Sequence, residues 1–251
     1  MKKVLIIGYG IVGHNLAEEL SVLQPDIYDK YKPDENTRKE GERYDVAFVC
    51  ADTPYVPGKY VCDTREVESA ILENDADVFV VKSTVLPGTV DYLKNATGKA
   101  VIFSPEYYGG TQHCNNFDFP FTILGGERTA CLKIQQILQR VYDGRHAFRI
   151  TDSKTAELTK YMDNAFLATK VSFCTQFWSV AKQIGVDYEE LRELFTLDPR
   201  VGKSHTFVYD ESPFWKSHCL DKDVSAIAET YGMDLLLNVI EFNEKMKKTV
   251  W

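Results

Sequence analysis

The sequence predicts an α/β domain with a doubly wound parallel sheet, followed by an all-helical domain with a long central helix. Three observations lead to this fold class. Short apolar runs alternate with helical patterns in the first part of the chain, a glycine-rich turn joins the first run to the first helix, and only helical patterns follow residue 150. We therefore expect two domains, residues 1–150 and 151–251.

The glycine-rich turn predicts a dinucleotide cofactor. A short apolar strand runs into Gly8-Tyr9-Gly10-Ile11-Val12-Gly13 and then into an amphipathic helix, which is the proper context for this fingerprint. Gly8 allows the tight turn, Gly10 lets the backbone approach a pyrophosphate, and Gly13 lets the helix pack closely on the strand. The free N–H groups at the helix start would face the phosphates. All six turn residues are expected to bind the cofactor of a Rossmann-like domain.

A second short strand, residues 26–28, ends at Asp29. An acidic side chain there can accept hydrogen bonds from the ribose of NAD and would repel the extra phosphate of NADP. NAD is therefore the expected cofactor, with Asp29 and Lys30 among its ligands. Because Lys30 and Lys32 follow the acid directly, NADP stays open as an alternative.

The other elements of the first domain follow in chain order. They are a strand at 45–50, a helix at 64–72, strands at 78–81 and 101–103, and a helix at 129–141 that is preceded by the segment 123–126. A polar segment between the second and third strands is expected to hold little regular structure.

The helical domain begins at Asp152-Ser153, a typical helix start. Residues 154–184 contain neither glycine nor proline, which predicts one long helix. Its apolar residues cover more than one face, so we expect burial on several sides and a homodimer interface. Shorter helices are expected at about 188–195, 222–231 and 234–248.

Composition excludes some partners. A hydrophobic content of 44% and a charged content of 26% are ordinary for a globular protein, while the net charge of −8 argues against nucleic acid. No apolar run reaches the length of a membrane span, and four apolar residues before Gly8 are too few for a signal peptide. The 6 cysteines form no CxxC pair, so we expect reduced thiols in a cytoplasmic protein and no metal site.

Two segments at strand ends carry candidate site residues. Ser83 and Thr84 leave a buried strand at its carboxyl end, where ligands bind in open α/β sheets, although a structural turn closed by Pro87-Gly88 would use the same residues. Glu106 follows the next strand and can act as a general base or hold a water. An ordinary surface glutamate is the alternative.

Two further candidates lie in the helical domain. Lys160 and Asn164 are four residues apart on one helix face and can both stabilise an oxyanion, with Glu157 one turn earlier to orient the lysine. Cys219 lies near a helix start with Lys222 close by, which favours the thiolate. A thiolate can attack an aldehyde, and a second oxidation then gives a thioester that water hydrolyses. A solvated helix face and a small buried cysteine are the simpler alternatives.

Together these segments resemble the UDP-glucose/GDP-mannose dehydrogenase family, in the family's order and over nearly the whole chain. The matching segments are the glycine turn, Cys50-Ala51-Asp52-Thr53-Pro54, Ser83-Thr84, Gly88-Thr89, Ser104-Pro105-Glu106, Lys160 with Asn164, Asp198-Pro199-Arg200-Val201-Gly202 and Cys219-Leu220-Asp221-Lys222-Asp223. The resemblance implies oxidation of the C6 primary alcohol of a nucleotide sugar, UDP-glucose or a similar one, to a carboxylate with two NAD per turnover.

The resemblance also implies a role for each matching residue. As catalytic residues it implies Cys219 as nucleophile, Lys160 and Asn164 for the oxyanions, Thr84 and Glu106 for water and proton transfers, and Asp223 in support. To the cofactor site it adds Thr53, Ser83, Thr84 and Lys222. As substrate ligands it implies Glu106, Tyr107, Tyr108, Lys160, Asn164 and Arg200, the last reaching across a dimer.

Two differences from the family shape further expectations. The family usually has two glycines shortly before the cysteine, whereas this chain has Trp215-Lys216-Ser217-His218, so that loop should have a different shape. The family also has a third domain that binds the nucleotide, and this chain ends at Trp251. We expect a short form whose nucleotide pocket is rebuilt from its own two domains or supplied by a partner chain.

Two other functions stay open at this stage. A one-step β-hydroxyacid dehydrogenase has a similar architecture and a comparable Lys-x-x-x-Asn pair, but it has no need of Cys219. A non-catalytic NAD-binding protein of the same family would keep the glycine turn without turnover. Nucleotide-sugar oxidation accounts for the largest number of matched residues.

Overall fold

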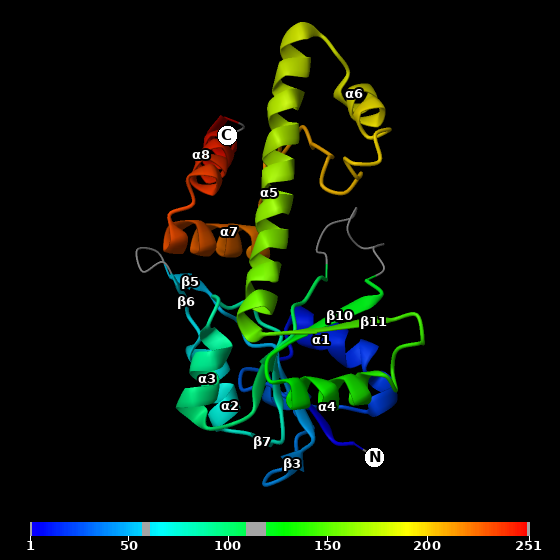
Figure 1. Ribbon diagram of the computed structural model, residues 1–251. Helices are drawn as coiled ribbons and strands as arrows, with labels where there is room; N and C mark the ends of the chain where they lie inside the picture. The colour runs from blue at the N-terminus through cyan, green and yellow to red at the C-terminus, as the bar shows by residue number, and fades with distance from the viewer. Residues whose placement is uncertain (1, 57–60, 109–118, 250–251) are drawn as a thin grey trace. The chain divides into compact units, whose positions relative to one another are not determined.

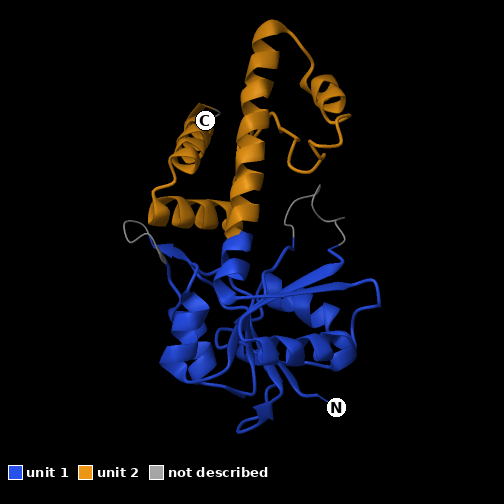
Figure 2. Cartoon of the chain, in the orientation of Figure 1, with its two compact units in different colours: residues 1–56, 61–108, 117–160 blue, residues 57–60, 109–116, 161–251 orange. Residues whose placement is uncertain are grey.

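The computed structural model describes residues 2–56, 61–108 and 119–249 (Figure 1). The chain divides into two compact units (Figure 2). Of the described residues, unit 1 comprises 2–56, 61–108 and 119–160, and unit 2 comprises 161–249. Unit 1 includes the first turns of the long helix because Ala156 packs in the core of the sheet.

Unit 1 contains a seven-stranded sheet with the order β11-β10-β9-β8-β4-β1-β2. Its strands are β1 (Val4–Ile7), β2 (Asp26–Tyr28), β4 (Val46–Val49), β8 (Phe79–Val81), β9 (Val101–Phe103), β10 (Phe121–Gly125) and β11 (Ala147–Thr151). The strands from β2 to β9 in this order pair in parallel. β10 runs antiparallel to β9 and parallel to β11, so the predicted parallel sheet is confirmed except at this edge.

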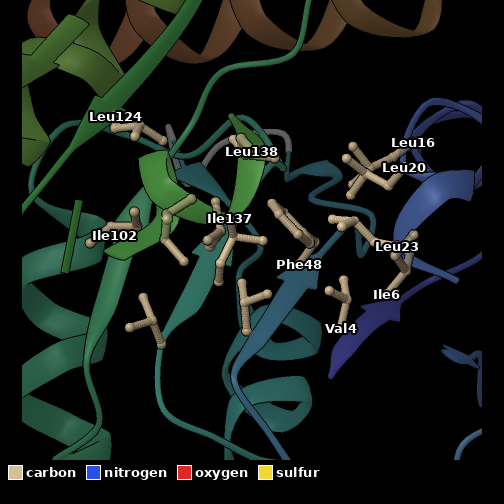
Figure 3. Close-up of a cluster of buried hydrophobic side chains, with 14 of the residues drawn as sticks. Val4, Ile6, Leu16, Leu20, Leu23, Phe48, Ile102, Leu124, Ile137 and Leu138 are labelled. Carbon is tan, nitrogen blue, oxygen red and sulfur yellow. The ribbon is translucent and has the colours of Figure 1, made fainter. Parts of the chain in front are cut away.

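Helices cover both faces of the sheet, which confirms the doubly wound class. One core joins the sheet to α1 (Ile11–Glu19) and α4 (Arg128–Leu138) (Figure 3). The other joins it to α2 (Arg65–Leu72) and α3 (Thr89–Thr97). Successive side chains of a strand point to opposite faces, so Ile6 enters the first core and Leu5 the second.

Several elements of unit 1 were not predicted. They are α3, β10, β11, the short 3-10 helices η1 (Ser21–Leu23) and η2 (Pro33–Glu35), and two small strand pairs, β3 (Arg43–Tyr44) with β7 (Asp75–Ala76) and β5 (Tyr55–Val56) with β6 (Val61–Cys62). The polar segment between β2 and β4 holds only η2 and β3, as expected for little regular structure.

The long helix α5 (Ser153–Ile184) begins in unit 1 and continues into unit 2, where α6 (Tyr188–Phe195), α7 (His218–Tyr231) and α8 (Asp234–Thr249) follow. The predicted helical region is thereby confirmed. α7 begins at His218 rather than near residue 222, because the Ser217 hydroxyl accepts a hydrogen bond from the Leu220 N–H and caps the helix. The expectation that α5 is buried on several sides is not met within one chain, since Met162, Phe166 and Phe173 are exposed.

The cysteines of the described residues are all free thiols. Cys114 lies outside the described residues. Among the helices that the structure describes, none combines the length and the apolar character of a membrane span.

Candidate active site

The glycine-rich turn connects β1 to α1. In the sheet, β1 lies between β2 and β4. Gly8 has φ of 90°, and a Cβ on Gly13 would lie 1.9 Å from the Gly8 carbonyl oxygen. A Cβ on Gly10 would meet no atom within 4 Å, and no side chain caps the helix that begins beside it. The N-terminus of α1 therefore offers N–H groups and open space, which fits a dinucleotide pyrophosphate.

Asp29 lies against this turn at the end of β2. Its carboxylate accepts hydrogen bonds from the Tyr9 N–H at 2.7 Å and the Tyr31 N–H at 2.8 Å. Lys30 pairs with Glu66, and the Lys32 ammonium donates to the Tyr9 carbonyl at 2.8 Å. Both lysines thus have partners in the protein, while an acidic group remains beside the turn, as a ribose of NAD requires.

The side-chain hydroxyls of Thr53 and Ser83, two predicted cofactor ligands, connect the loop that follows β4 to the loop that follows β8. Thr53 is buried and donates to the Thr84 carbonyl at 2.8 Å, and Ser83 donates to the Ala51 carbonyl at 2.5 Å. The structure therefore brings Thr53, Ser83 and Thr84 together at one edge of the sheet, where ligands bind in such folds.

Glu106 is held on both of its carboxylate oxygens. Oε1 accepts from the N–H groups of Tyr107 at 2.7 Å and Tyr108 at 3.2 Å, while Oε2 lies 3.2 Å from the Lys82 ammonium. Lys82 was missed by the sequence reasoning, although its place next to Ser83 at a strand end was a signal. Burial raises the pKa of the nearby Cys50 thiol to about 12, so this cysteine stays protonated at neutral pH.

Lys160 lies over an aromatic ring. Its ammonium is 4.8 Å from the centroid of Tyr107, which also packs against Phe119 and Phe121. The ring face attracts the cation of this buried lysine. Tyr107 and Lys160, both predicted substrate ligands, are thus neighbours.

The other predicted tyrosine makes a different contact. The hydroxyl of Tyr108 donates to Glu19 at the end of α1, and the hydroxyl of Tyr142 donates to the same carboxylate. Burial raises the pKa of Tyr108 well above its usual range, so the hydroxyl stays a donor. This contact fixes the loop that carries Glu106 to the helix of the glycine turn.

Glu157 closes the start of α3. Its side chain is fully buried, and the carboxylate accepts from the N–H groups of Gly88 at 2.6 Å and Val90 at 2.8 Å. Burial raises the pKa of Glu157 to about 7 against the effect of these two hydrogen bonds. The carboxylate thereby attaches α5, one turn before Lys160, to the helix that follows the Ser83 loop, a contact that the sequence reasoning missed.

In unit 2, two predicted site residues, Asn164 and Lys222, bond the buried carboxylate of a third, Asp223. Asn164 donates to one oxygen of Asp223 at 2.6 Å, and the Lys222 ammonium lies 2.5 Å from the other oxygen. Asp223 is 1% exposed, and each of its two oxygens has one of these partners. In this structure, Lys222, a predicted cofactor ligand, therefore pairs with Asp223.

Cys219 and Arg200 are exposed residues of unit 2. Cys219 lies in the first turn of α7, where the positive end of the helix dipole favours a thiolate. Arg200 forms a two-pronged pair with Asp198, with contacts of 3.0 and 2.6 Å. Within the described ranges, no group of three or more His, Cys, Asp or Glu side chains is placed to hold a metal ion.

The mostly parallel sheet, the open glycine turn and the helical unit together define a Rossmann-like α/β fold that is followed by a helical region. Residues 154–245 match the sequence profile of the UDP-glucose/GDP-mannose dehydrogenase family, central domain. The chain belongs to this family.

Individual relatives agree with this assignment. The chain is 28% identical over 225 residues to the UDP-glucose 6-dehydrogenase of Rickettsia prowazekii, covering 82% of this chain and 50% of the relative. It is 31% identical over 206 residues to the GDP-mannose 6-dehydrogenase of Pseudomonas aeruginosa, covering 73% of this chain and 46% of the relative. The chain thus spans about half the length of these curated relatives.

A solved structure shows the same fold. The UDP-glucose dehydrogenase of Pyrobaculum islandicum superposes with a TM-score of 0.81 at 24% identity, covering 99% of this chain and 69% of that one. The fold class predicted from the sequence is therefore confirmed by comparison as well.

Proposed function

We propose that this protein is an NAD-dependent oxidoreductase that oxidises the C6 primary alcohol of a nucleotide sugar, such as UDP-glucose, to a carboxylate. Family membership and the open N-terminus of α1 support the proposal. NAD bound at the glycine turn would accept one hydride in each of two oxidation steps. NAD is favoured over NADP because Lys30 and Lys32 pair within the protein and Asp29 adjoins the turn.

In the first step the alcohol loses a proton and a hydride and becomes an aldehyde. Lys160 supplies a positive charge for the alkoxide, and Asn164 supplies a hydrogen-bond donor for the oxyanion. Glu106, held by two N–H groups and Lys82, is the carboxylate that accepts the proton directly or through a water.

In the second step the Cys219 thiolate adds to the aldehyde carbon and forms a carbon–sulfur bond. Loss of a hydride from this thiohemiacetal gives a thioester. Water, held by Thr84 and Glu106, then breaks the carbon–sulfur bond, which releases the acid and returns the thiol. Asp223 supports this step by holding Asn164 and Lys222.

The central test is the number of NADH formed per sugar oxidised. We expect absorbance assays with a panel of UDP- and GDP-sugars to give two NADH per sugar, and the Cys219→Ser variant to lose acid formation. One NADH per sugar with a dispensable thiol would instead indicate a one-step β-hydroxyacid dehydrogenase. If calorimetry shows NAD binding while no sugar binds or reacts, the protein is a non-catalytic NAD-binding member of the family.

We also propose that the protein forms a homodimer through α5. The exposed apolar side chains of this helix recur at a spacing near 3.5 residues, as in helix pairs that pack along a common seam. In unit 2 they are Met162, Phe166, Phe173, Phe177, Val180 and Ile184. Sedimentation should give the mass of a dimer for the wild type and of a monomer for Phe173→Glu. A monomeric wild type at micromolar concentration would contradict the dimer.

A further inference from the structure

The residue four positions before Cys219 is held by the C-terminal helix α8. The side-chain amide of Asn243 bonds both backbone groups of Trp215. The Trp215 N–H donates to Oδ1 at 3.0 Å, and Nδ2 donates to the Trp215 carbonyl at 2.9 Å. Asn243 is 1% exposed, so neither bond competes with water. Two opposed bonds from one planar amide fix both the position and the direction of the backbone at Trp215.

The indole of Trp215 attaches the same residue to α5. Its Nε1–H donates to the Ser172 hydroxyl at 3.0 Å, and both side chains are buried. The ring packs in a small core with Ala168, Val224 and Val239, which come from α5, α7 and α8. Trp215 is therefore anchored through its backbone and its side chain.

The turn that carries Cys219 is closed immediately afterwards. Ser217 caps α7 through the Leu220 N–H, and the Ser217 N–H donates to Asp221 at 2.7 Å. The Lys247 ammonium of α8 donates to the other Asp221 oxygen at 2.7 Å. α8 thus supports the segment on both sides of Cys219, through Asn243 before it and through Lys247 after it.

We propose that Asn243 and Trp215 are positioning residues for Cys219: they hold the entry to α7 so that the thiol stays in the first turn of the helix. There the N–H groups and dipole of α7 stabilise the thiolate. The proposal rests on the proposed function in that it takes Cys219 as the nucleophile, but it concerns the thiol itself and can be measured without any sugar.

The test is the rate at which iodoacetamide alkylates Cys219 in the full chain at pH 7.5, read by mass spectrometry of the Cys219 peptide. For Asn243→Ala we expect a rate about three- to tenfold lower, because a loosened first turn stabilises less thiolate. The matched control is Asn238→Ala on the same helix, whose amide bonds only the Asp234 carbonyl of its own turn. This control should react at the wild-type rate.

Two milder variants keep the test decisive if Asn243→Ala does not fold. Trp215→Phe and Ser172→Ala remove the indole hydrogen bond while leaving the pairing with Asn243 intact, and each should slow alkylation by about twofold. Wild-type rates in every folded variant of Asn243, Trp215 and Ser172 would overturn the proposal. A wild type that oxidises no sugar would count against the proposed function, whereas the alkylation rates would still decide the positioning role.

If the wild type is active, the Asn243 variant should also affect kcat and the KM for NAD differently. Asn243→Ala should lower kcat and leave the KM for NAD unchanged, because Asn243 lies in unit 2 and the glycine turn in unit 1. A general loss of structure would instead change both constants together.

Discussion

Two helix N-termini of this protein, those of α1 and α7, are built in opposite ways. α1 begins beside Gly10 with no side-chain cap and with open space where a Cβ would stand. α7 begins after Ser217, whose hydroxyl caps the helix, while Asp221 binds the N–H of the cap residue itself. Both ends carry the positive end of a helix dipole. In the function that we propose, the first end receives the pyrophosphate of the cofactor, and the second holds the thiol of Cys219 in the first turn of α7.

The largest effect should come from filling the glycine turn of α1. A Cβ at Gly13 would lie 1.9 Å from the Gly8 carbonyl oxygen, so Gly13→Ala must push strand and helix apart. We expect a loss of about 3 kcal/mol or more in the free energy of unfolding, together with loss of NAD binding. Urea denaturation and calorimetry would measure the two effects.

Gly10→Ala is the matched control in the same turn. Its Cβ would meet no protein atom within 4 Å, so the free energy of unfolding should stay within about 0.5 kcal/mol of the wild type. NAD affinity should fall nevertheless, because the methyl group would occupy the space of the pyrophosphate. Unchanged NAD affinity in Gly10→Ala would show that the cofactor does not use the open end of α1.

The next effect concerns the buried carboxylate behind the first turn of α7. Asp223→Ala removes the shared partner of Asn164, which is buried, and of Lys222, whose side chain is 11% exposed. We expect the free energy of unfolding to fall by about 3 kcal/mol. The control is Arg200→Ala, which removes the exposed pair with Asp198, keeps the backbone N–H of residue 200 that bonds the Asp198 carboxylate, and should leave the denaturation midpoint unchanged. If both variants had the same free energy of unfolding, the buried contacts of Asp223 would stabilise the protein no more than the exposed pair of Asp198 and Arg200.

The N-terminus of α3 is built in a third way: it is closed by the carboxylate of Glu157, a residue of the distant helix α5. The folded state raises the pKa of Glu157 from its ordinary 4.5 to about 7, so it favours the neutral carboxyl. The stabilisation is complete below pH 4.5 and is lost as the pH rises through 7. Relative to Glu157→Gln, the wild type should therefore lose about 3 kcal/mol in its free energy of unfolding between pH 4.5 and 8. Denaturant curves at four pH values would measure it, and parallel pH profiles would contradict it.

The smallest effect should come from opening the closed end of α7. Ser217→Ala removes the hydroxyl that accepts from the Leu220 N–H, and we expect a loss of about 1 kcal/mol in the free energy of unfolding. Ser179→Ala is a control, because that hydroxyl bonds only a carbonyl within α5. A loss no larger than that of Ser179→Ala would show that the remaining contacts of Asp221 and Trp215 are sufficient to hold the turn.

Local signals explain which elements could be predicted. The strands β1, β2 and β9 and the helices α5, α6 and α8 have their apolar spacing, caps and breakers within their own sequence, and they were found nearly to the residue. α3 was missed because no element was predicted between the strands at 78–81 and 101–103, and its start is closed by Glu157 from a distant helix. The start of α7 was placed too late because the capping role of Ser217 was not considered.

The sequence by itself determined the α/β class, the long helix, the glycine turn and the family, since each depends on residues that are neighbours along the chain. Only the tertiary structure decided the partners of the charged side chains: Lys82 for Glu106, the start of α3 for Glu157, and Asp223 for Lys222. The pairing of Asn243 with Trp215 belongs to the same group. The physical reason is that these contacts join different elements, and a side chain's environment depends on which elements fold against it rather than on the residues beside it in the chain.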